Sequence, residues 1–210
     1  MSELGLGRTL GILRLIATFG FIVALVVLSA PRPGEVAIGF VIAAAGEAIR
    51  FWAAGHLLKT QELITSGPYR YTRNPLYLGR LLILTGLCVM CRLPFHANWI
   101  CLGIGLAVFF GYYLPRKERI EPARLRALHG EAYDRYFKAV PALFPTLRPY
   151  ANASNLGWSS DRMFRNREVW MVVGIVAITY FLLWKAHRVP PRPELPPPHV
   201  PRVGASPISG

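Results

Sequence analysis

The sequence has few acidic residues and few cysteines. Only 11 Asp and Glu stand against 24 Lys and Arg, so the formal net charge is +13 over 210 residues. The three cysteines, Cys88, Cys91 and Cys101, lie in or beside apolar runs. No second pair follows Cys88 and Cys91 at the spacing of a zinc site. We therefore expect buried free thiols and no metal site.

The surplus of positive charge indicates the kind of partner. Basic proteins typically bind nucleic acid or anionic lipid. The sequence contains no nucleic-acid motif, and 53% of its residues are hydrophobic, with a mean hydropathy of +0.34. A soluble domain of this size is usually more polar. The composition therefore favours the lipid bilayer as partner and argues against nucleic acid.

Five long apolar segments account for this composition. They are Thr9–Ala30, Val36–Leu58, Leu76–Met90, Ala97–Leu114 and Val169–Trp184. A transmembrane helix needs about 20 mostly apolar residues, and several of the segments approach that length. None alternates strictly, so helices are predicted rather than barrel strands. The first is long for a signal peptide and is interpreted as a retained helix. The sequence thus predicts an all-α, multi-pass transmembrane bundle of about five spans, with short turns joining the first and second, and the third and fourth, as antiparallel pairs.

The distribution of arginine and lysine predicts the orientation of the bundle. These residues cluster between the second and third segments and between the fourth and fifth, whereas the alternate loops carry only Arg32 and Arg92. Cytoplasmic loops are enriched in positive charge. We therefore expect the N-terminus and the active site on the cytoplasmic side. The C-terminal tail falls on the opposite side, and its Lys185, Arg188, Arg192 and Arg202 count against that placement.

Two regions outside the spans have a different character. Residues 116–139 show a helical pattern without enough apolar residues to span, so we expect a cytoplasmic helical region lying in the membrane interface and broken at Gly130. Residues 190–210 are rich in proline and cannot build a core, which predicts a disordered or extended tail. The chain thus divides into a membrane domain over residues 1–189 and this tail.

The most informative stretch runs from Thr65 to Gly79 and contains two arginines and three tyrosines. A Gly-Pro pair predicts a turn, and the proline after Asn74 favours a helix that starts there. A helix start offers free N–H groups to a carboxylate, and tyrosine faces attract a sulfonium cation. The stretch is therefore a candidate binding loop, with Tyr69, Tyr71 and Tyr77 as its walls. In the alternative interpretation, these side chains are headgroup anchors at the interface.

Two charged pairs accompany this loop. Lys117 and Glu121 are four residues apart and share a helix face. The carboxylate suits an amino group of a ligand and the cation suits an anionic substrate, although a solvated charged turn has the same pattern. Glu47 and Arg50 lie inside the second apolar segment, where charged residues usually face the bundle. An internal ion pair and a functional role both agree with this placement.

These residues resemble the signatures of the isoprenylcysteine carboxyl methyltransferase and phospholipid methyltransferase superfamily, whose members are integral membrane enzymes that use S-adenosylmethionine. The loop is similar to the superfamily pattern Gly-x-Tyr…Arg-His-Pro-x-Tyr-x-Gly through Gly67, Tyr69, Arg73, Asn74, Pro75, Tyr77 and Gly79. A second motif is matched in order by Glu121, Gly130, Tyr133, Tyr136, Val140 and Pro141. The resemblance covers residues 45–148.

The resemblance implies a set of site residues. The implied cofactor contacts are Gln61, Glu62, Leu63, Ile64, Tyr69, Asn74, Pro75, Leu76, Tyr77 and Glu121. Lys117 stands where the carboxyl methyltransferases have a basic residue that meets the substrate. Arg50 resembles an arginine of the second helix in this superfamily. Lys117 and Arg50 are therefore the candidate catalytic residues, with S-adenosylmethionine as cofactor.

Departures from the signature bear on the methyl acceptor. Asn74 replaces a histidine and cannot carry charge, and Pro122 replaces the second acid of the usual pair. Lys117 in place of arginine weakens bidentate recognition of a carboxylate. These changes affect a prenylcysteine substrate more than the cofactor. Because an ionised carboxylate needs no base and a lipid amine does, the sequence favours an isoprenylcysteine carboxyl methyltransferase-like enzyme acting on a lipidic or prenylated acid.

Three alternatives stay open at this point. A phospholipid N-methyltransferase shares the cofactor and differs in the acceptor. An NADPH-dependent sterol or enone reductase has a similar C-terminal signature, but these enzymes are generally longer and have more spans. A non-catalytic membrane scaffold keeps the helices without binding cofactor.

Overall fold

The computed structural model describes residues 2–58, 62–166 and 168–188. Every regular element in these residues is a helix, which confirms the predicted all-α class. The elements are α1 (Ser2–Leu28), α2 (Pro33–His56), the 3₁₀ turn η1 (Gly67–Arg70), α3 (Pro75–Met90), the 3₁₀ turn η2 (Pro94–His96), α4 (Ala97–Val108), the π-helical η3 (Phe109–Tyr113), α5 (Leu114–His129), α6 (Glu131–Ala139), α7 (Ser160–Arg165) and α8 (Glu168–Arg188). Gln61 and the proline-rich tail lie outside the described residues.

Among the described residues, four helices are long and apolar enough to cross a membrane. They are Gly11–Leu28 within α1, Pro33–His56, the continuous helix Pro94–His129, and Glu168–Arg188. The third predicted segment, α3, is apolar but has 16 residues. It therefore rises about 24 Å, less than the roughly 30 Å of a hydrocarbon core.

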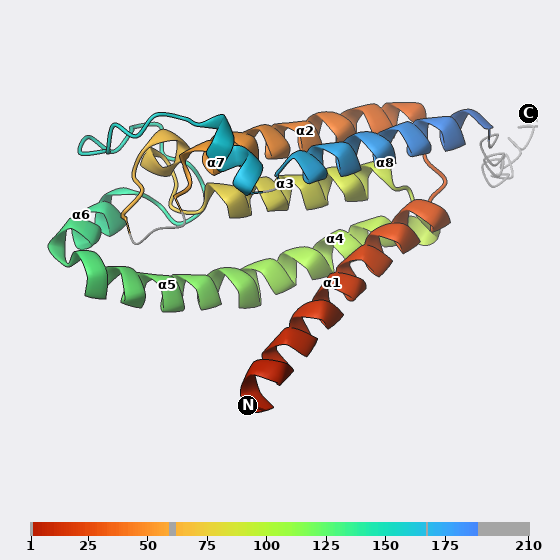
Figure 1. Cartoon of the computed structure of the whole chain (residues 1–210). Helices are drawn as coiled ribbons and strands as arrows, with labels where there is room; N and C mark the ends of the chain where they lie inside the picture. The colour runs from red at the N-terminus through yellow and green to blue at the C-terminus, as the bar shows by residue number, and fades with distance from the viewer. Residues whose placement is uncertain (1, 59–61, 167, 189–210) are drawn as a thin grey trace, which may run out of the picture.

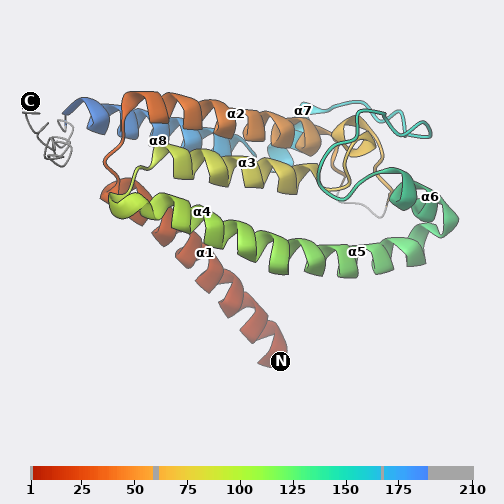
Figure 2. The same ribbon diagram turned by 180° about the vertical axis from the view of Figure 1, so that it is seen from behind.

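The helices form a bundle in which some pairs pack more closely than others. The helices α2, α3 and α8 run side by side, and α4 and α5 lie along this group as one long helix (Figures 1 and 2). The core between them contains Val36, Ile83, Met90 and Leu182, all buried. Bulky apolar side chains on the outer faces of α2, α4 and α8 are exposed, which suits contact with lipid.

Helices α2 and α3 approach closely because glycines face each other. A Cβ built on Gly46 would lie 2.7 Å from the carbonyl oxygen of Gly79, and one built on Gly86 would lie 2.5 Å from that of Gly39. The two glycines of each helix are seven residues apart, so they lie on one face. Small residues allow backbones to pack together inside a membrane. This contact fixes the start of α3 relative to α2.

We expect Gly46→Ala to destabilise the bundle by about 1–3 kcal/mol, because the added methyl presses against the α3 backbone. Gly103→Ala is the matched control, since a Cβ on Gly103 in α4 would meet nothing within 4 Å. That change is expected to be neutral or stabilising, because alanine is the better helix former. Unfolding by sodium dodecyl sulfate in mixed micelles measures both variants. Equal effects would contradict the role of the glycine contact.

Helix α1 departs from the predicted antiparallel pairing with α2. It leaves the group at an angle (Figure 1), and Leu25 and Val26 near its C-terminal end join the core. Lys185 of α8 donates hydrogen bonds to the carbonyl oxygens of Val26 and Val27, at 3.3 and 2.7 Å, where a helix end lacks partners. The small-residue face of α2 is occupied by α3, so α1 contacts the bundle near its end. The other predicted pair, α3 and α4, does lie side by side.

The predicted helical region after Leu114 is present, and its first part is continuous with the preceding segment, because α4 and α5 form one unbroken helix (Figure 1). Pro115 favours a break, since proline lacks the N–H that continues a helix. The π-helical segment η3 precedes it, and its wider turn pairs the N–H of Leu114 with the carbonyl oxygen of Phe109. Helix α5 therefore carries its charges beyond the span. It ends where predicted, at Gly130, which has a φ of 52°.

Candidate active site

The loop from Gly67 to Asn74 is held against the segment 141–150. Three backbone hydrogen bonds join them: Arg73 N–H to Pro141 O at 2.9 Å, Thr146 N–H to Tyr71 O at 3.0 Å, and Tyr150 N–H to Arg70 O at 2.9 Å. The predicted turn is present as η1, and Gly67 has a φ of 56°. A Cβ on Gly67 would come within 2.3 Å of the His56 ring. Only glycine fits here, which brings the loop against the end of α2.

Glu118 of α5 ties this loop to the long helix. One carboxylate oxygen accepts a hydrogen bond from Asn74 Nδ2 at 2.7 Å, and the other pairs with the Arg73 guanidinium. Asn74 Nδ2 also donates to the Ala142 carbonyl oxygen at 2.8 Å. Arg73 lies 3.7 Å from the centroid of the Phe137 ring and donates to the Phe137 carbonyl oxygen at 2.7 Å. Asn74 thus acts as a neutral double donor that positions the loop.

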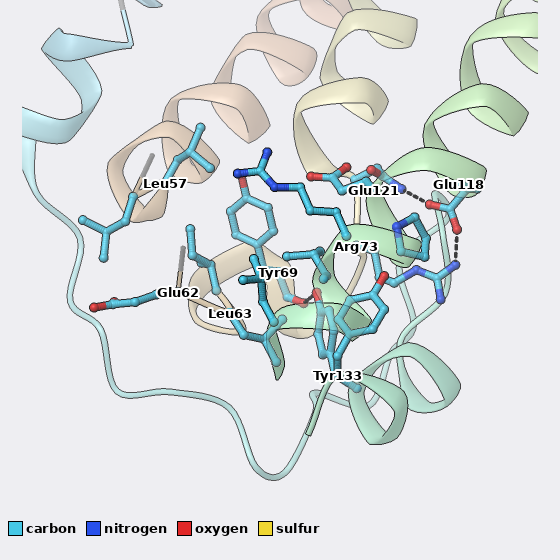
Figure 3. Close-up of a pocket in the computed structure, with 16 residues that line it drawn as sticks. Leu57, Glu62, Leu63, Tyr69, Arg73, Glu118, Glu121 and Tyr133 are labelled. Atoms are coloured by element: carbon cyan, nitrogen blue, oxygen red, sulfur yellow. Dashed lines mark hydrogen bonds and ion pairs between the residues drawn. The ribbon is translucent and has the colours of Figure 1, made fainter. Parts of the chain in front are cut away.

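A cavity of about 370 Å³ lies between this loop, the end of α2, and helices α5 and α6 (Figure 3). The lining residues are Leu57, Leu58, Glu62, Leu63, Ile64, Tyr69, Arg73, Asn74, Glu118, Glu121, Pro122, Arg124, Leu125, Leu128, Tyr133 and Tyr136. Apolar and aromatic walls with a few charged groups, at this volume, are typical of small-molecule sites.

Part of the predicted cofactor set lines this cavity. The lining includes Glu62, Leu63, Ile64, Tyr69, Asn74 and Glu121. Pro75, Leu76 and Tyr77 form the start of α3 and are not among the lining residues, and Gln61 lies outside the described residues. Cofactor contact by any of these residues stays a prediction. The structure brings the two sequence motifs together around one space.

Three buried tyrosines contribute to the wall. The Tyr136 hydroxyl donates a hydrogen bond to the Tyr69 carbonyl oxygen at 2.7 Å, and its ring centroid lies 6.4 Å from that of Tyr133. Burial raises the pKa of the phenol in Tyr69, Tyr133 and Tyr136. These phenols therefore stay protonated at physiological pH. They offer aromatic faces and hydrogen-bond donors and are not bases.

The charges around the cavity are unevenly distributed. Glu62 lies on the opposite side from Glu118 and Glu121 (Figure 3). Glu121 pairs with Lys117 at 2.7 Å, as their spacing predicts. Arg124 is exposed and forms no ion pair within the described residues. The cavity can therefore receive a ligand that carries both a positive centre and a carboxylate.

Arg50, a candidate catalytic residue, is buried between α2 and α8. Its Nη2 lies 2.5 Å from Glu168 Oε2, and its Nε lies 3.3 Å from Glu47 Oε2. The predicted pair with Glu47 is thus confirmed. Arg50 Nη1 also donates to the Leu76 carbonyl oxygen at 3.4 Å, close to the start of α3. Arg50 does not line the cavity, and a catalytic role for it stays a prediction.

Several residues of the site were not predicted from the sequence. These are Arg73, Glu118, Arg124 and the apolar residues Leu57, Leu125 and Leu128. Glu118 is three residues before Glu121 and shares its helix face, which is a usable signal.

No group of three His, Cys, Asp or Glu residues in the described part of the chain is placed to hold a metal ion. Cys88 and Cys91 are buried free thiols, as predicted, and Cys101 is half-buried.

The family described as phospholipid methyltransferase matches residues 36–118. Residues 36–118 are thus similar to this family, and they make up less than half of the chain. The matched segment runs from the first turn of α2 to Glu118, and so includes Arg50, the loop and α3. The family lies within the superfamily that the motifs resemble, and it supports a membrane methyltransferase. The far wall of the cavity, from Glu121 to Tyr136, lies outside the phospholipid methyltransferase match.

Two curated proteins are also similar to the chain. The nickel-cobalt-cadmium resistance protein NccN of Alcaligenes xylosoxydans xylosoxydans and the cobalt-zinc-cadmium resistance protein CzcN of Cupriavidus metallidurans are each 33% identical over 107 residues. The match covers 50% of this chain and 47% and 46% of the two relatives. The chain thus spans about half the length of the curated relatives it matches. No solved structure matches the chain.

Proposed function

We propose that this protein transfers a methyl group from S-adenosylmethionine to a lipidic or membrane-embedded acceptor. The observation that carries the proposal is the 370 Å³ cavity, in which the family-matched loop meets the acidic face of α5. The cavity lies at the end of the bundle where the predicted cytoplasmic loops gather. We therefore propose a cytoplasmic active site that a membrane acceptor reaches from the bilayer.

The lining fits S-adenosylmethionine by the chemistry of its groups. Leu63, Leu125 and the tyrosine faces suit a nucleoside base. Glu62 and Glu121 attract positive groups, and the exposed Arg124 suits a carboxylate. When bound, this cofactor supplies an electrophilic methyl group: the acceptor's lone pair forms the new bond to carbon, the carbon–sulfur bond breaks, and sulfur keeps the electron pair as a neutral thioether.

The contribution of the chain is to bind and orient. Holding two reactants in line can supply up to about 7–11 kcal/mol of the barrier. The Glu118 contacts fix the loop, and the neutral tyrosines shape the wall. A carboxylate acceptor yields an ester and releases no proton, so it needs no base, and no imidazole lines the described cavity. A lipid carboxylate, as in the isoprenylcysteine carboxyl methyltransferases, is therefore our first candidate.

The second candidate is the amine of a phospholipid headgroup, which the description of the matched family favours. A protonated amine must lose its proton before it attacks. Glu62 or Glu121 would accept that proton within the cavity. The names of the two relatives state resistance to metal ions. We propose that such resistance is an indirect effect of the methylated membrane component.

Labelling with a tritiated methyl donor separates the two acceptors. Membranes that contain the protein are incubated with labelled S-adenosylmethionine, and the lipid and protein fractions are treated with alkali. A methyl ester releases volatile labelled methanol, whereas an N-methyl group stays attached. Volatile label therefore identifies the carboxylate, and stable label identifies the amine. Absence of transfer to either fraction contradicts the proposed function.

We expect Glu121→Ala to abolish measurable binding of S-adenosylmethionine while the protein still inserts into the membrane. Glu121 is one of the two acidic residues of α5 that line the cavity, and it is the one that pairs with Lys117. Calorimetry on detergent-purified protein, with S-adenosylmethionine and NADPH titrated in parallel, measures the effect. Binding of NADPH alone would assign the chain to the reductases, and binding of neither would leave the scaffold alternative.

The matched control for this variant is Glu131→Ala. Glu131 is the exposed first residue of α6, and its Oε2 lies 3.4 Å from Arg135 Nη1. Neither residue lines the cavity. Its replacement is expected to leave cofactor affinity unchanged. Unchanged affinity in Glu121→Ala would refute the assignment of Glu121.

A further inference from the structure

Arg80 is the only charged residue in the sequence of α3, and it lies in the second turn of an apolar helix. Its side chain is exposed on the surface of the bundle. No acidic side chain forms an ion pair with Arg80 within the described residues. An arginine at membrane depth is costly and usually pairs with another group. An anion from outside the described residues would therefore stabilise the charge of Arg80.

The surroundings of Arg80 point to the space beside α4 and α5. Tyr77, one turn before it on α3, packs on Phe109 with ring centroids 6.1 Å apart. Leu84, one turn after it, lies against Gly105 of α4. Since residues three and four apart share a helix face, Arg80 lies on the face of α3 that is turned toward the long helix. Its position is thus beside the boundary between α3 and the α4–α5 helix.

A second cation converges on the same tyrosine. The Arg80 guanidinium carbon lies 5.3 Å from the centroid of the Tyr77 ring, and Lys117 Nζ lies 4.6 Å from it. The Tyr77 ring is therefore in contact with two positive groups, one from α3 and one from α5. Cation–π contact of this kind fixes the positions of the groups without neutralising them.

The two cations link the membrane surface to the cavity. Lys117 Nζ lies 2.7 Å from Glu121 Oε2, and Glu121 lines the cavity. Two cations and one carboxylate leave a net charge of +1 across Arg80, Lys117 and Glu121. A monoanionic group placed beside Tyr77 would neutralise that charge. Its position would be next to the cavity and open to the bilayer.

We propose that Arg80 and Lys117 together bind the anionic group, a phosphate or a carboxylate, of a single-tailed or double-tailed membrane amphiphile that enters between α3 and α5. Its apolar tail stays in the bilayer, where the exposed apolar side chains of α4 meet lipid. That this amphiphile is the methyl acceptor rests on the proposed function. The binding site itself does not.

Native mass spectrometry of the protein in a neutral detergent tests the site. The probes are dodecyl phosphate and dodecanoate, which share a tail and differ in the anionic group. The wild-type protein is expected to retain one equivalent of at least one probe. Arg80→Gln is expected to weaken that binding at least about tenfold, the ratio expected when one charge-assisted contact is lost. Arg80→Lys is expected to keep most of the affinity, because it keeps the charge.

The matched control is Arg188→Gln in α8. Arg188 is also an exposed arginine over an aromatic ring, 4.9 Å from the centroid of Trp184. Its replacement is expected to leave binding of both probes unchanged. A selective loss of dodecyl phosphate in Arg80→Gln would identify a phospholipid headgroup, and a selective loss of dodecanoate would identify a lipid acid. Equal losses in Arg80→Gln and Arg188→Gln, or no loss in Arg80→Gln, would overturn the site.

Calorimetry with S-adenosylmethionine on the same samples separates this proposal from the proposed function. Arg80→Gln is expected to bind the cofactor as the wild-type protein does, which also shows that the variant is folded. If the wild-type protein binds a probe through Arg80 but never binds S-adenosylmethionine, the anion site stands and the methyltransferase proposal fails. If the cofactor binds and neither probe depends on Arg80, the reverse holds.

Discussion

Replacing Glu118 with alanine is expected to lower methyl transfer at least about 100-fold. The carboxylate holds Asn74 and Arg73 at once, and through them the loop that lines the cavity. Hydrogen bonds that involve a charged group contribute about 1.5–3 kcal/mol each. Loss of about 2.7 kcal/mol of transition-state stabilisation corresponds to a factor of 100 in rate. Incorporation of labelled methyl into the membrane fraction measures the effect.

Two further variants locate the cause of this loss. Glu118→Gln keeps the shape and one acceptor oxygen, so it can satisfy one of the two donors and is expected to retain intermediate activity. Glu131→Ala removes an exposed acid of α6 and is expected to behave as wild type. Hydrogen exchange of residues 67–74 reports on the loop directly. Wild-type transfer and exchange in Glu118→Ala would show that the backbone bonds to residues 141–150 suffice to hold the loop.

The site was predictable where its chemistry is local in the sequence. The turn at Gly67 and the Lys117–Glu121 pair follow from residue types a few positions apart, and both are present in the structure. The ion pair between Arg73 and Glu118 joins residues 45 positions apart, and no local pattern indicates it. The resemblance implied a role for Glu121, whereas the acid of the described cavity that contacts both Arg73 and Asn74 is Glu118.

The fold shows the same division. Apolar runs predicted the helices, because backbone N–H and C=O groups in lipid must form hydrogen bonds within the protein, and a helix satisfies them within one segment. The continuity of α4 and α5 was missed because the apolar pattern ends at Leu114, and the π-helical turn before Pro115 has no simple sequence signal. The departure of α1 from α2 depends on which helix occupies the glycine face of α2. That competition is decided by tertiary packing and not by the turn that joins them.

Replacing Arg50 with methionine is expected to destabilise the bundle by about 3–5 kcal/mol. Arg50 is the cation between two buried acids, Glu47 and Glu168. Its removal leaves both carboxylates buried in the bundle without their arginine partner. Breaking a buried ion pair from one side has this magnitude. Arg92→Met is the control, because Arg92 and Glu35 form a partly exposed pair at 3.9 Å, and such pairs contribute about 0–1 kcal/mol. Unfolding in mixed micelles compares the two variants, and equal effects would contradict a structural role for the buried group.

Restoring the charge balance distinguishes a structural Arg50 from a catalytic one. In the triple variant Arg50→Met, Glu47→Gln, Glu168→Gln, no unpaired charge is left in the group, so we expect the free energy of unfolding to return to within about 1–2 kcal/mol of wild type. If methyl transfer returns with stability, Arg50 acts by fixing α8 and the start of α3, where it reaches the Leu76 carbonyl oxygen. If stability returns and transfer does not, Arg50 acts in the reaction, as the family resemblance implies. Because Arg50 does not line the cavity, we expect the first result.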